Sequence, residues 1–189
     1  CLSKVYPDLA KEWHPTKNNK LNPNNLFCRS TRKVWWKCPQ GPDHEWEQSP
    51  RQRVKAKIRC LYCDGKKLSV TNSLQAVSPK TAKYWHPTKN GELTPNDVTF
   101  KDTKKVWWKC SKGPDHVWET TVANKVLLSE CIYCNGNKVS VTNSLGSKFP
   151  QVAREWDYKL NYPLTPNNVT SGSSLKVYWR CSFDPTHTW

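Results

Sequence analysis

Cysteine and histidine residues recur along the chain at spacings that suit a metal ion. Twice, a cysteine is followed by a histidine and then by a Cys-x-x-Cys pair. Three thiolates and one imidazole fill the tetrahedral shell of a structural Zn2+ and leave no open position for an activated water. We therefore predict two structural zinc sites, whose ligands are Cys38, His44, Cys60 and Cys63, and Cys110, His116, Cys131 and Cys134.

A third copy of the pattern begins near the end of the sequence. Cys181 and His187 match the first two ligands, and Trp189 is reached before a second cysteine pair. We expect this third site to be incomplete within these residues. The chain is then an array of zinc modules with two complete sites.

The residues around the ligands repeat with the same period as the ligands. Trp13, Trp85 and Trp156 recur at intervals of about seventy residues, which indicates duplication of a whole unit. The expected modules are residues 1–66, 67–137 and 138–189, the last without its second cysteine pair.

A short helix is expected near the start of each module. In segment 74–85, Ser78 precedes Pro79 and apolar residues follow at helical spacing. This order predicts an N-capped helix with proline in its first turn, ended by Pro87.

A β-hairpin is expected after the helix, which makes the fold class small α+β. Residues 104–110 and 117–122 favour strands, and a Gly-Pro-Asp turn between them would carry Cys110 and His116. The metal would then clamp this hairpin to the cysteine pair that follows.

The composition favours small metal-stapled modules over one large core. Apolar residues are 36% of the chain and the mean hydropathy is −0.83. A module of about seventy residues is near the size below which a domain needs a disulfide or a bound metal ion for stability. Nine cysteines, an odd number, accompanied by histidines indicate zinc rather than disulfides, and hence an intracellular reducing compartment. Nucleus, cytoplasm and organelle all stay open, and the sequence has no apolar run that would span a membrane.

The ordered motifs resemble a known family. Pro…Ala…Glu-Trp, Leu-Thr-Pro-Asn, Val-Trp-Trp-Lys-Cys, His-x-Trp and Cys-x-Tyr-Cys are similar to those of the tandem treble-clef zinc-finger repeats, also described as probable zinc-ribbon domains. The resemblance covers nearly the whole chain. It implies a knuckle, hairpin and helix around each zinc ion, the same ligands as above, and a presumed nucleic-acid role, sometimes beside nuclease domains.

Alignment of the copies indicates that four cysteine and histidine residues are not zinc ligands. Cys1 aligns with serines and Cys28 with a phenylalanine. His14 and His86 align with Asp157, and a required ligand is not expected to change in one copy of three.

The chain is strongly basic. Lysine and arginine number 30 against 15 acidic residues, a formal charge of +15. Each Cys3His zinc site subtracts one charge, so two sites lower the total to +13. Such a chain attracts phosphate polymers with salt-sensitive affinity.

One basic segment alternates with uncharged residues. In an extended conformation its cations would lie on one face and could follow a sugar-phosphate backbone. An equal alternative is a solvated strand edge that resists aggregation. The cations are Arg51, Arg53, Lys55, Lys57 and Arg59.

The outer face of each hairpin places an aromatic ring between two cations. This arrangement suits base stacking beside phosphates, although packing against a neighbouring module is the favoured interpretation. The tryptophan that follows the histidine of each hairpin, Trp46, Trp118 or Trp189, is expected in the core. The outer faces comprise Lys33, Trp35 and Lys37; Lys105, Trp107 and Lys109; and Lys176, Tyr178 and Arg180.

These features favour a non-enzymatic nucleic-acid-binding zinc array. Structured RNA, in a ribosome-like or other ribonucleoprotein assembly, is the preferred partner because separate basic patches suit irregular RNA surfaces. The alternatives are a double-stranded DNA-binding accessory region of a nuclease or chromatin protein, and a protein-interaction scaffold. The sequence has no recognisable catalytic constellation.

Overall fold

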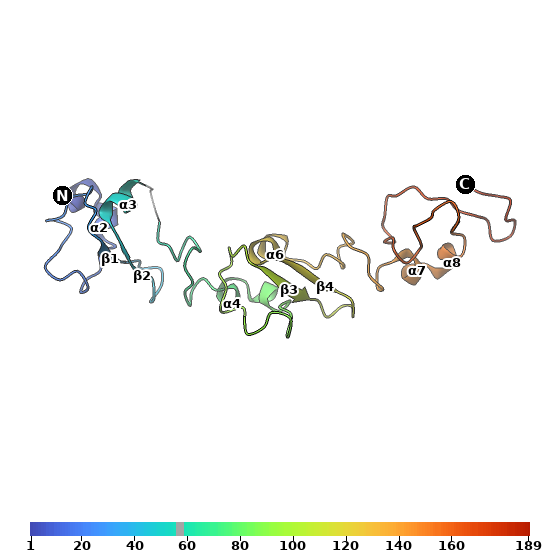
Figure 1. The fold of residues 1–189 in the computed structure, drawn as a ribbon, viewed down its shortest axis with the longest axis horizontal. Coiled ribbons are helices and arrows are strands. Elements are labelled where there is room, and N and C mark those ends of the chain that lie inside the picture. Colours follow the sequence, from blue (N-terminus) through green and yellow to red (C-terminus); the bar gives the residue numbers. More distant parts are fainter. Residues whose placement is uncertain (56–58) are drawn as a thin grey trace. The chain divides into compact units, whose positions relative to one another are not determined.

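The computed structural model describes residues 1–55 and 59–189 (Figure 1). Their contacts form two compact units, Cys1–Lys83 with Glu92–Lys104, and Tyr84–Gly91 with Lys105–Trp189. We describe each unit by itself. The module boundaries expected after residues 66 and 137 stay a prediction.

Short helices and two-stranded hairpins make up both units, which confirms the small α+β class. The first unit contains α1 (Leu2–Val5), α2 (Pro7–Ala10), β1 (Val34–Lys37), β2 (Glu45–Gln48), α3 (Pro50–Lys55), α4 (Leu74–Val77) and α5 (Pro79–Ala82). The second contains β3 (Lys105–Lys109), β4 (Val117–Thr121), α6 (Val122–Leu128), α7 (Leu145–Lys148) and α8 (Pro150–Ala153). No helix among the described residues is long and apolar enough to cross a membrane.

The helix expected with Ser78 as its N-cap and Pro79 in its first turn forms as the single turn α5, without a side-chain cap hydrogen bond, and another turn, α4, precedes it. The hydroxyl of Ser73 caps α4 by accepting a hydrogen bond from the Ala76 N–H at 3.2 Å. Ser78 separates the turns with φ −139° and ψ 68°, because a residue before proline is disfavoured in the helical region. The proline therefore starts a second turn rather than extending the first.

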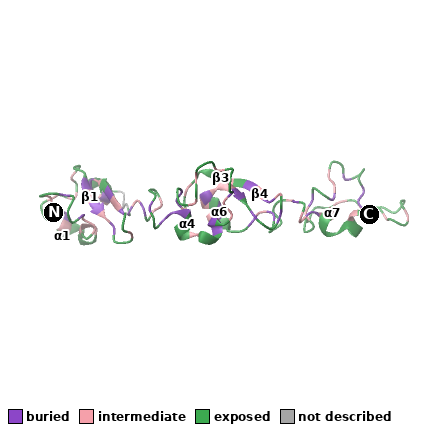
Figure 2. Ribbon diagram, turned by 90° about the horizontal axis from the view of Figure 1, so that it is seen from below, coloured by how far each residue is buried: buried purple, intermediate pink, exposed green. Residues whose placement is uncertain are grey.

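The two hairpins form as expected and share one register. β1 pairs antiparallel with β2 so that Trp36 faces Trp46, and β3 pairs with β4 so that Trp108 faces Trp118. Alternation along β1 and β3 buries every second residue, and β2 and β4 each bury their tryptophan (Figure 2). One face of each hairpin is thus core, and the other is available to solvent.

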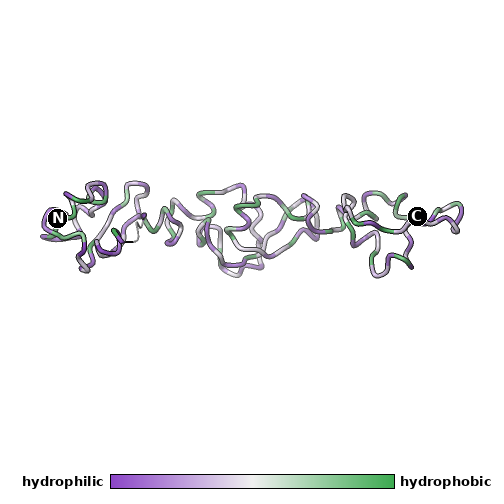
Figure 3. The backbone as a smooth tube through the Cα atoms, turned by 90° about the horizontal axis from the view of Figure 1, so that it is seen from above, coloured by the Kyte–Doolittle hydropathy of each residue, from purple (hydrophilic) through white to green (hydrophobic). Residues whose placement is uncertain are grey.

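A pair of tryptophans holds each hairpin to the segment that follows the helical turns. The rings of Trp13 and Trp36 meet edge to face at 5.5 Å between centroids, and Trp85 and Trp108 do so at 5.4 Å. Aromatic pairs in this geometry prefer such edge contacts. Apolar residues occur in short stretches between polar ones along the tube coloured by hydropathy (Figure 3). The tryptophans share the core with small groups of aliphatic side chains such as Leu2 and Val34.

The three tryptophans expected in the core differ in burial. Trp46 and Trp118 are buried, whereas Trp189 is 59% exposed. Trp46 is covered by Arg53 and Tyr62. The core position expected for Trp189 is therefore wrong in this structure.

Candidate metal centres

The first ligand cluster gathers residues from the hairpin and from the segment after α3. Cys38 follows β1 and His44 precedes β2, and the Cys38 N–H donates to the His44 carbonyl at 3.0 Å. Cys60 and Cys63 approach from the other side, and the four ligand atoms all lie within 4.8 Å of one another. The second cluster repeats this arrangement with Cys110, His116, Cys131 and Cys134.

The separations between ligand atoms match a tetrahedron around zinc. The sulfur atoms of Cys38 and Cys63 are 3.7 Å apart, and both cysteine sulfurs of the following pair lie 3.6 Å from Nδ1 of His44. A tetrahedron with Zn–S bonds of about 2.3 Å has edges of about 3.8 Å. Both Cys3His sites therefore fit Zn2+.

The thiols of each cluster need a cation to ionise together. Desolvation at the cluster and the neighbouring sulfur atoms raise the pKa of Cys63 to about 12, and the pKa of Cys134 to about 12. Desolvation by burial also raises the pKa of Cys60. Coordination to Zn2+ supplies the positive charge that lets three adjacent thiols become thiolates.

A glycine in each turn gives the histidine ring its space. A Cβ atom at Gly41 would lie 2.5 Å from Nε2 of His44, and one at Gly113 would lie 2.5 Å from Nε2 of His116. No side chain fits at either position without moving the imidazole. Glycine is therefore required in each turn because the imidazole of the ligand histidine occupies the space that a Cβ atom would need.

The third copy departs from this geometry. Asp184 occupies the position of these glycines, and its Oδ2 lies 3.3 Å from Nε2 of an exposed His187. Cys181 is only partly buried. The incomplete third site therefore stays a prediction.

Two tyrosines that the metal pattern did not include support the ligands. Tyr62 stacks on His44 with centroids 4.9 Å apart and an interplanar angle of 6°, and Tyr133 stacks on His116 at 4.9 Å and 10°. The Tyr62 hydroxyl donates to the Glu45 carbonyl at 2.8 Å. A tyrosine recurs at the same position inside both Cys-x-Tyr-Cys pairs, and this repetition is the feature of the sequence that indicates a supporting role.

The alternating basic segment is not extended where the structure describes it. Pro50–Lys55 is helix α3, so the expected row of cations along a strand is wrong for this part, and Lys57 lies outside the described residues. Arg51, Lys55 and Arg59 are exposed, but Arg53 is only 3% exposed.

Arg53 instead lies beneath the aromatic core of its hairpin. Its guanidinium carbon is 4.8 Å from the centroid of Trp36 and 4.9 Å from that of Trp46, and Nη2 donates to Oε2 of Glu12 at 2.8 Å. Cation–π contact and the ion pair offset part of the cost of burying this charge, since Nε and Nη1 of Arg53 are buried without a hydrogen-bond partner among the described residues.

Lys125 takes the same place in the other hairpin and is 1% exposed. Its Nζ lies 4.1 Å from the ring of Tyr84, which occupies the repeat position of Glu12, and donates to the Ser129 carbonyl. Desolvation by burial lowers the pKa of this lysine. A buried cation is therefore a shared structural element of both complete modules.

The outer hairpin face of the first module is partly neutralised. Nζ of Lys17, from the same module, lies 4.5 Å from the centroid of the Trp35 ring, and packing of this ring against a neighbouring module stays a prediction. Glu45 Oε2 accepts from Lys17 at 2.6 Å and Oε1 accepts from Lys37 at 3.0 Å. These two lysines hold the pKa of Glu45 down to about 2, so the carboxylate is ionised at neutral pH. Lys33 on the same face is exposed.

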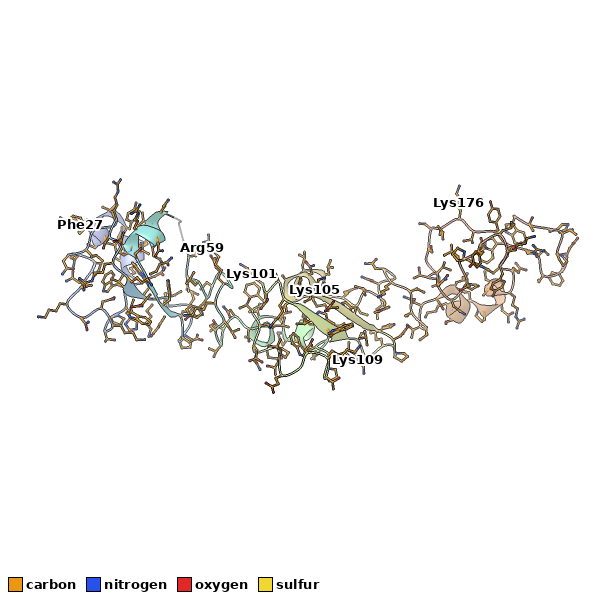
Figure 4. The ribbon with its side chains drawn as sticks, viewed as in Figure 1. Phe27, Arg59, Lys101, Lys105, Lys109 and Lys176 are labelled. Atoms are coloured by element: carbon orange, nitrogen blue, oxygen red, sulfur yellow. The ribbon has the colours of Figure 1, made fainter. Side chains whose placement is uncertain are left out.

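The second module lacks that carboxylate. Val117 stands at the position of Glu45, while Lys89 lies over Trp107 at 4.2 Å from its ring centroid. Lys105 and Lys109 are exposed at the two ends of β3 (Figure 4). Glu119 is the cross-strand partner of Trp107, as Glu47 is of Trp35 in the first module. The face of the second module therefore carries three cations and one carboxylate around a half-buried ring.

The corresponding face of the third copy is again partly neutralised. Arg180 donates to Oδ2 of Asp157 from Nη2 at 2.6 Å and from Nε at 3.0 Å. Lys176 and Tyr178 are exposed, the latter to 53%. The structure thus ranks the three outer faces by charge, with that of the second module the most basic.

Comparison with known proteins agrees with this geometry. The profile of a family described as "Probable Treble clef zinc finger domain" matches residues 9–66, 81–137 and 152–189. The three matched segments contain both ligand clusters as well as Cys181 and His187. No curated protein matches the chain.

Proposed function

Because the chain belongs to the family of probable treble clef zinc finger domains, we propose that it is a non-enzymatic zinc array that binds nucleic acid, with structured RNA preferred. The coordination geometry supports the non-enzymatic part. Three sulfur atoms and one nitrogen close the tetrahedron, so neither centre offers a position for substrate or activated water. Zinc at these centres supplies folding free energy to the hairpins.

The outer face of β3 carries the proposal. Lys105 and Lys109 flank Trp107 along the strand, and Lys89 lies over its ring. A nucleobase can stack where the lysine now lies, while the ammonium groups meet the adjacent phosphates. The net charge of +13 with zinc bound supplies the longer-range attraction.

The preference for RNA rests on the small size of each of these faces. Each hairpin presents one ring and a few cations on strands of four or five residues, and residues 1–55 and 59–189 contain no long helix to enter a major groove. Unstacked bases in RNA loops and bulges are accessible to such small patches, whereas bases inside duplex DNA are not.

A binding comparison across a salt series tests the proposal. We expect the zinc-loaded chain to bind a fluorescent RNA stem-loop with affinity that falls as salt rises, and to bind a DNA duplex of equal length more weakly. The K105Q/K109Q variant should lose more affinity than K80Q/K83Q, which removes two exposed charges from α5 and its C-cap. Salt-independent or absent binding to both nucleic acids would overturn the proposal, and tighter binding to the duplex would overturn the preference for RNA.

A further inference from the structure

Each zinc-site histidine has a pair of hydroxyl groups on the side away from the metal. Nε2 of His44 lies 3.0 Å from Oγ of Ser69 and 2.7 Å from Oγ1 of Thr71. His116 repeats the arrangement with Ser140 at 3.0 Å and Thr142 at 2.8 Å. Nδ1 faces the cysteine sulfurs in both clusters, so Nε2 carries the proton when zinc is bound and donates it to the hydroxyl pair.

These hydroxyls lie outside the segments that match the family. The matches end at residues 66 and 137, and the next ones begin at residues 81 and 152. The intervening segments carry the same six residues, Ser-Val-Thr-Asn-Ser-Leu, at 69–74 and 140–145. We call residues 69–74 and 140–145 the linkers.

Each linker is hydrogen-bonded to the hairpin turn and to the segment around the Cys-x-x-Cys pair that precede it. We call these two parts together the zinc knuckle. The Asn72 side-chain amide donates to the carbonyl groups of Tyr62 at 2.6 Å and Lys67 at 2.7 Å, and Asp43 Oδ2 accepts from the Val70 N–H at 3.0 Å. Asn143 and Asp115 make the equivalent bonds in the second module. Asn72 is buried, so its bond to the Tyr62 carbonyl is shielded from water, whereas the bond between Val70 and Asp43 is exposed.

The far end of each linker begins the next helical turn. Ser73 caps α4, and the Leu74 N–H donates to the Val98 carbonyl at 2.9 Å. Thr99 returns to the knuckle by donating from Oγ1 to the Gly65 carbonyl at 3.0 Å. In the other unit, Ser144 caps α7 and the Leu145 N–H donates to the Val169 carbonyl at 2.9 Å.

We propose that the linkers are part of the zinc sites, and that zinc in one module fixes the first helical turn of the next. Ser69 and Thr71 are positioning residues for His44, and Ser140 and Thr142 are positioning residues for His116. Zinc holds Nδ1, which aims Nε2 at the hydroxyl pair and keeps the linker in the register that caps α4 or α7. Loss of zinc frees the imidazole to rotate and removes the fixed partner of the linker.

Paired substitutions in the full zinc-loaded chain test this coupling through metal affinity. S69A/T71V should weaken the first site by about 10- to 100-fold in chelator competition while the second site is unchanged. S140A/T142V should do the reverse. Thr71→Ser should retain affinity because it keeps the hydroxyl, and Thr103→Val is a matched control at an exposed threonine of the same unit. Unchanged affinity of the first site in S69A/T71V would overturn the positioning role.

Amide exchange tests the link to the next module even where a variant binds zinc poorly. In Cys60→Ser, with the second site still loaded, the amides of Ala76 and Val77 in α4 should lose protection while those of β3 keep it. The same variant should leave α7 protected. Full protection of α4 in Cys60→Ser protein that has lost its first zinc ion would overturn the proposed coupling.

Discussion

Asp157 occupies the repeat position of His14, and both side chains accept hydrogen bonds from the backbone N–H groups two and three residues later. Nδ1 of His14 accepts from Thr16 and Lys17 at 3.2 Å, and Oδ1 of Asp157 accepts from Lys159 and Leu160 at 2.9 Å. The position therefore requires an acceptor for a turn. This explains why histidine and aspartate exchange there and why neither needs a metal.

His86, the third member of this set, gives the cleanest substitution test. Its Nδ1 accepts from Thr88 at 3.3 Å and Lys89 at 3.2 Å, and burial lowers its pKa, which favours the neutral acceptor form. His86→Asp should preserve the turn. His86→Leu should destabilise the second module by about 0.5 to 1.5 kcal/mol for each lost bond, because two part-buried N–H groups lose their acceptor. Hydrogen exchange of the Lys89 amide measures the effect, and a loss of zinc stoichiometry in His86→Asp would contradict the non-ligand role.

The carboxyl of Asp157 should make the order of its turn depend on pH. The Leu160 N–H and the Arg180 guanidinium hold its pKa below the usual range. A depressed pKa in the folded state contributes stability that is present above the ordinary aspartate pKa and is lost as pH falls through the folded value. Protection of the Lys159 and Leu160 amides should therefore fall at acidic pH, and Asp157→Asn should remove this dependence. An identical pH profile in the two proteins would contradict the assignment.

Gly41 and Gly113 should be intolerant of alanine because of the ligand histidines. An added Cβ at either position would lie 2.5 Å from the imidazole. Gly41→Ala should weaken the first zinc site by at least about tenfold through displacement of the ligand. Gly172→Ala is the matched control, since nothing lies within 4 Å of its added Cβ. Chelator competition gives the readout, and equal zinc affinity in Gly41→Ala and the parent chain would refute the packing argument.

The charge difference between the first two hairpins predicts unequal roles in the proposed nucleic-acid binding. Val117→Glu should create in the second module the neutralisation that Glu45 produces in the first. RNA affinity should fall, and the slope of log K against log salt should decrease by about 0.7 to 0.9 for each phosphate that the protein no longer neutralises. Glu45→Val should have the opposite effect. If the two exchanges change affinity in the same direction, charge on the hairpin faces does not determine binding.

The metal ligands and hairpins could be predicted because their signals are local and duplicated. Ligand spacing fixes Cys110 and His116 at the ends of the turn, and strand alternation fixes which face of β3 is buried. Both depend on positions close in sequence. The pairing of Trp108 with Trp118 then follows from the turn.

The buried position of Arg53 could not be predicted from alternation alone. Its segment alternates as a strand would, but Ser49 and Gln52 form a capping box in which Ser49 Oγ accepts from the Gln52 N–H and Gln52 Oε1 accepts from the Ser49 N–H. This Ser-x-x-Gln motif, with Pro50 directly after the serine, specifies the start of a helix. The contact of Arg53 with Glu12 depends on tertiary packing between segments distant in sequence.

The coordination of zinc is the most direct test of the account. X-ray absorption and metal analysis of the purified chain should find two zinc ions, each with three sulfur ligands and one nitrogen ligand, matching the two Cys3His clusters. Cys131→Ser should reduce the content to one. Zinc sites with oxygen ligands, or an unchanged content of two in Cys131→Ser, would contradict the assignment of both clusters as structural zinc centres.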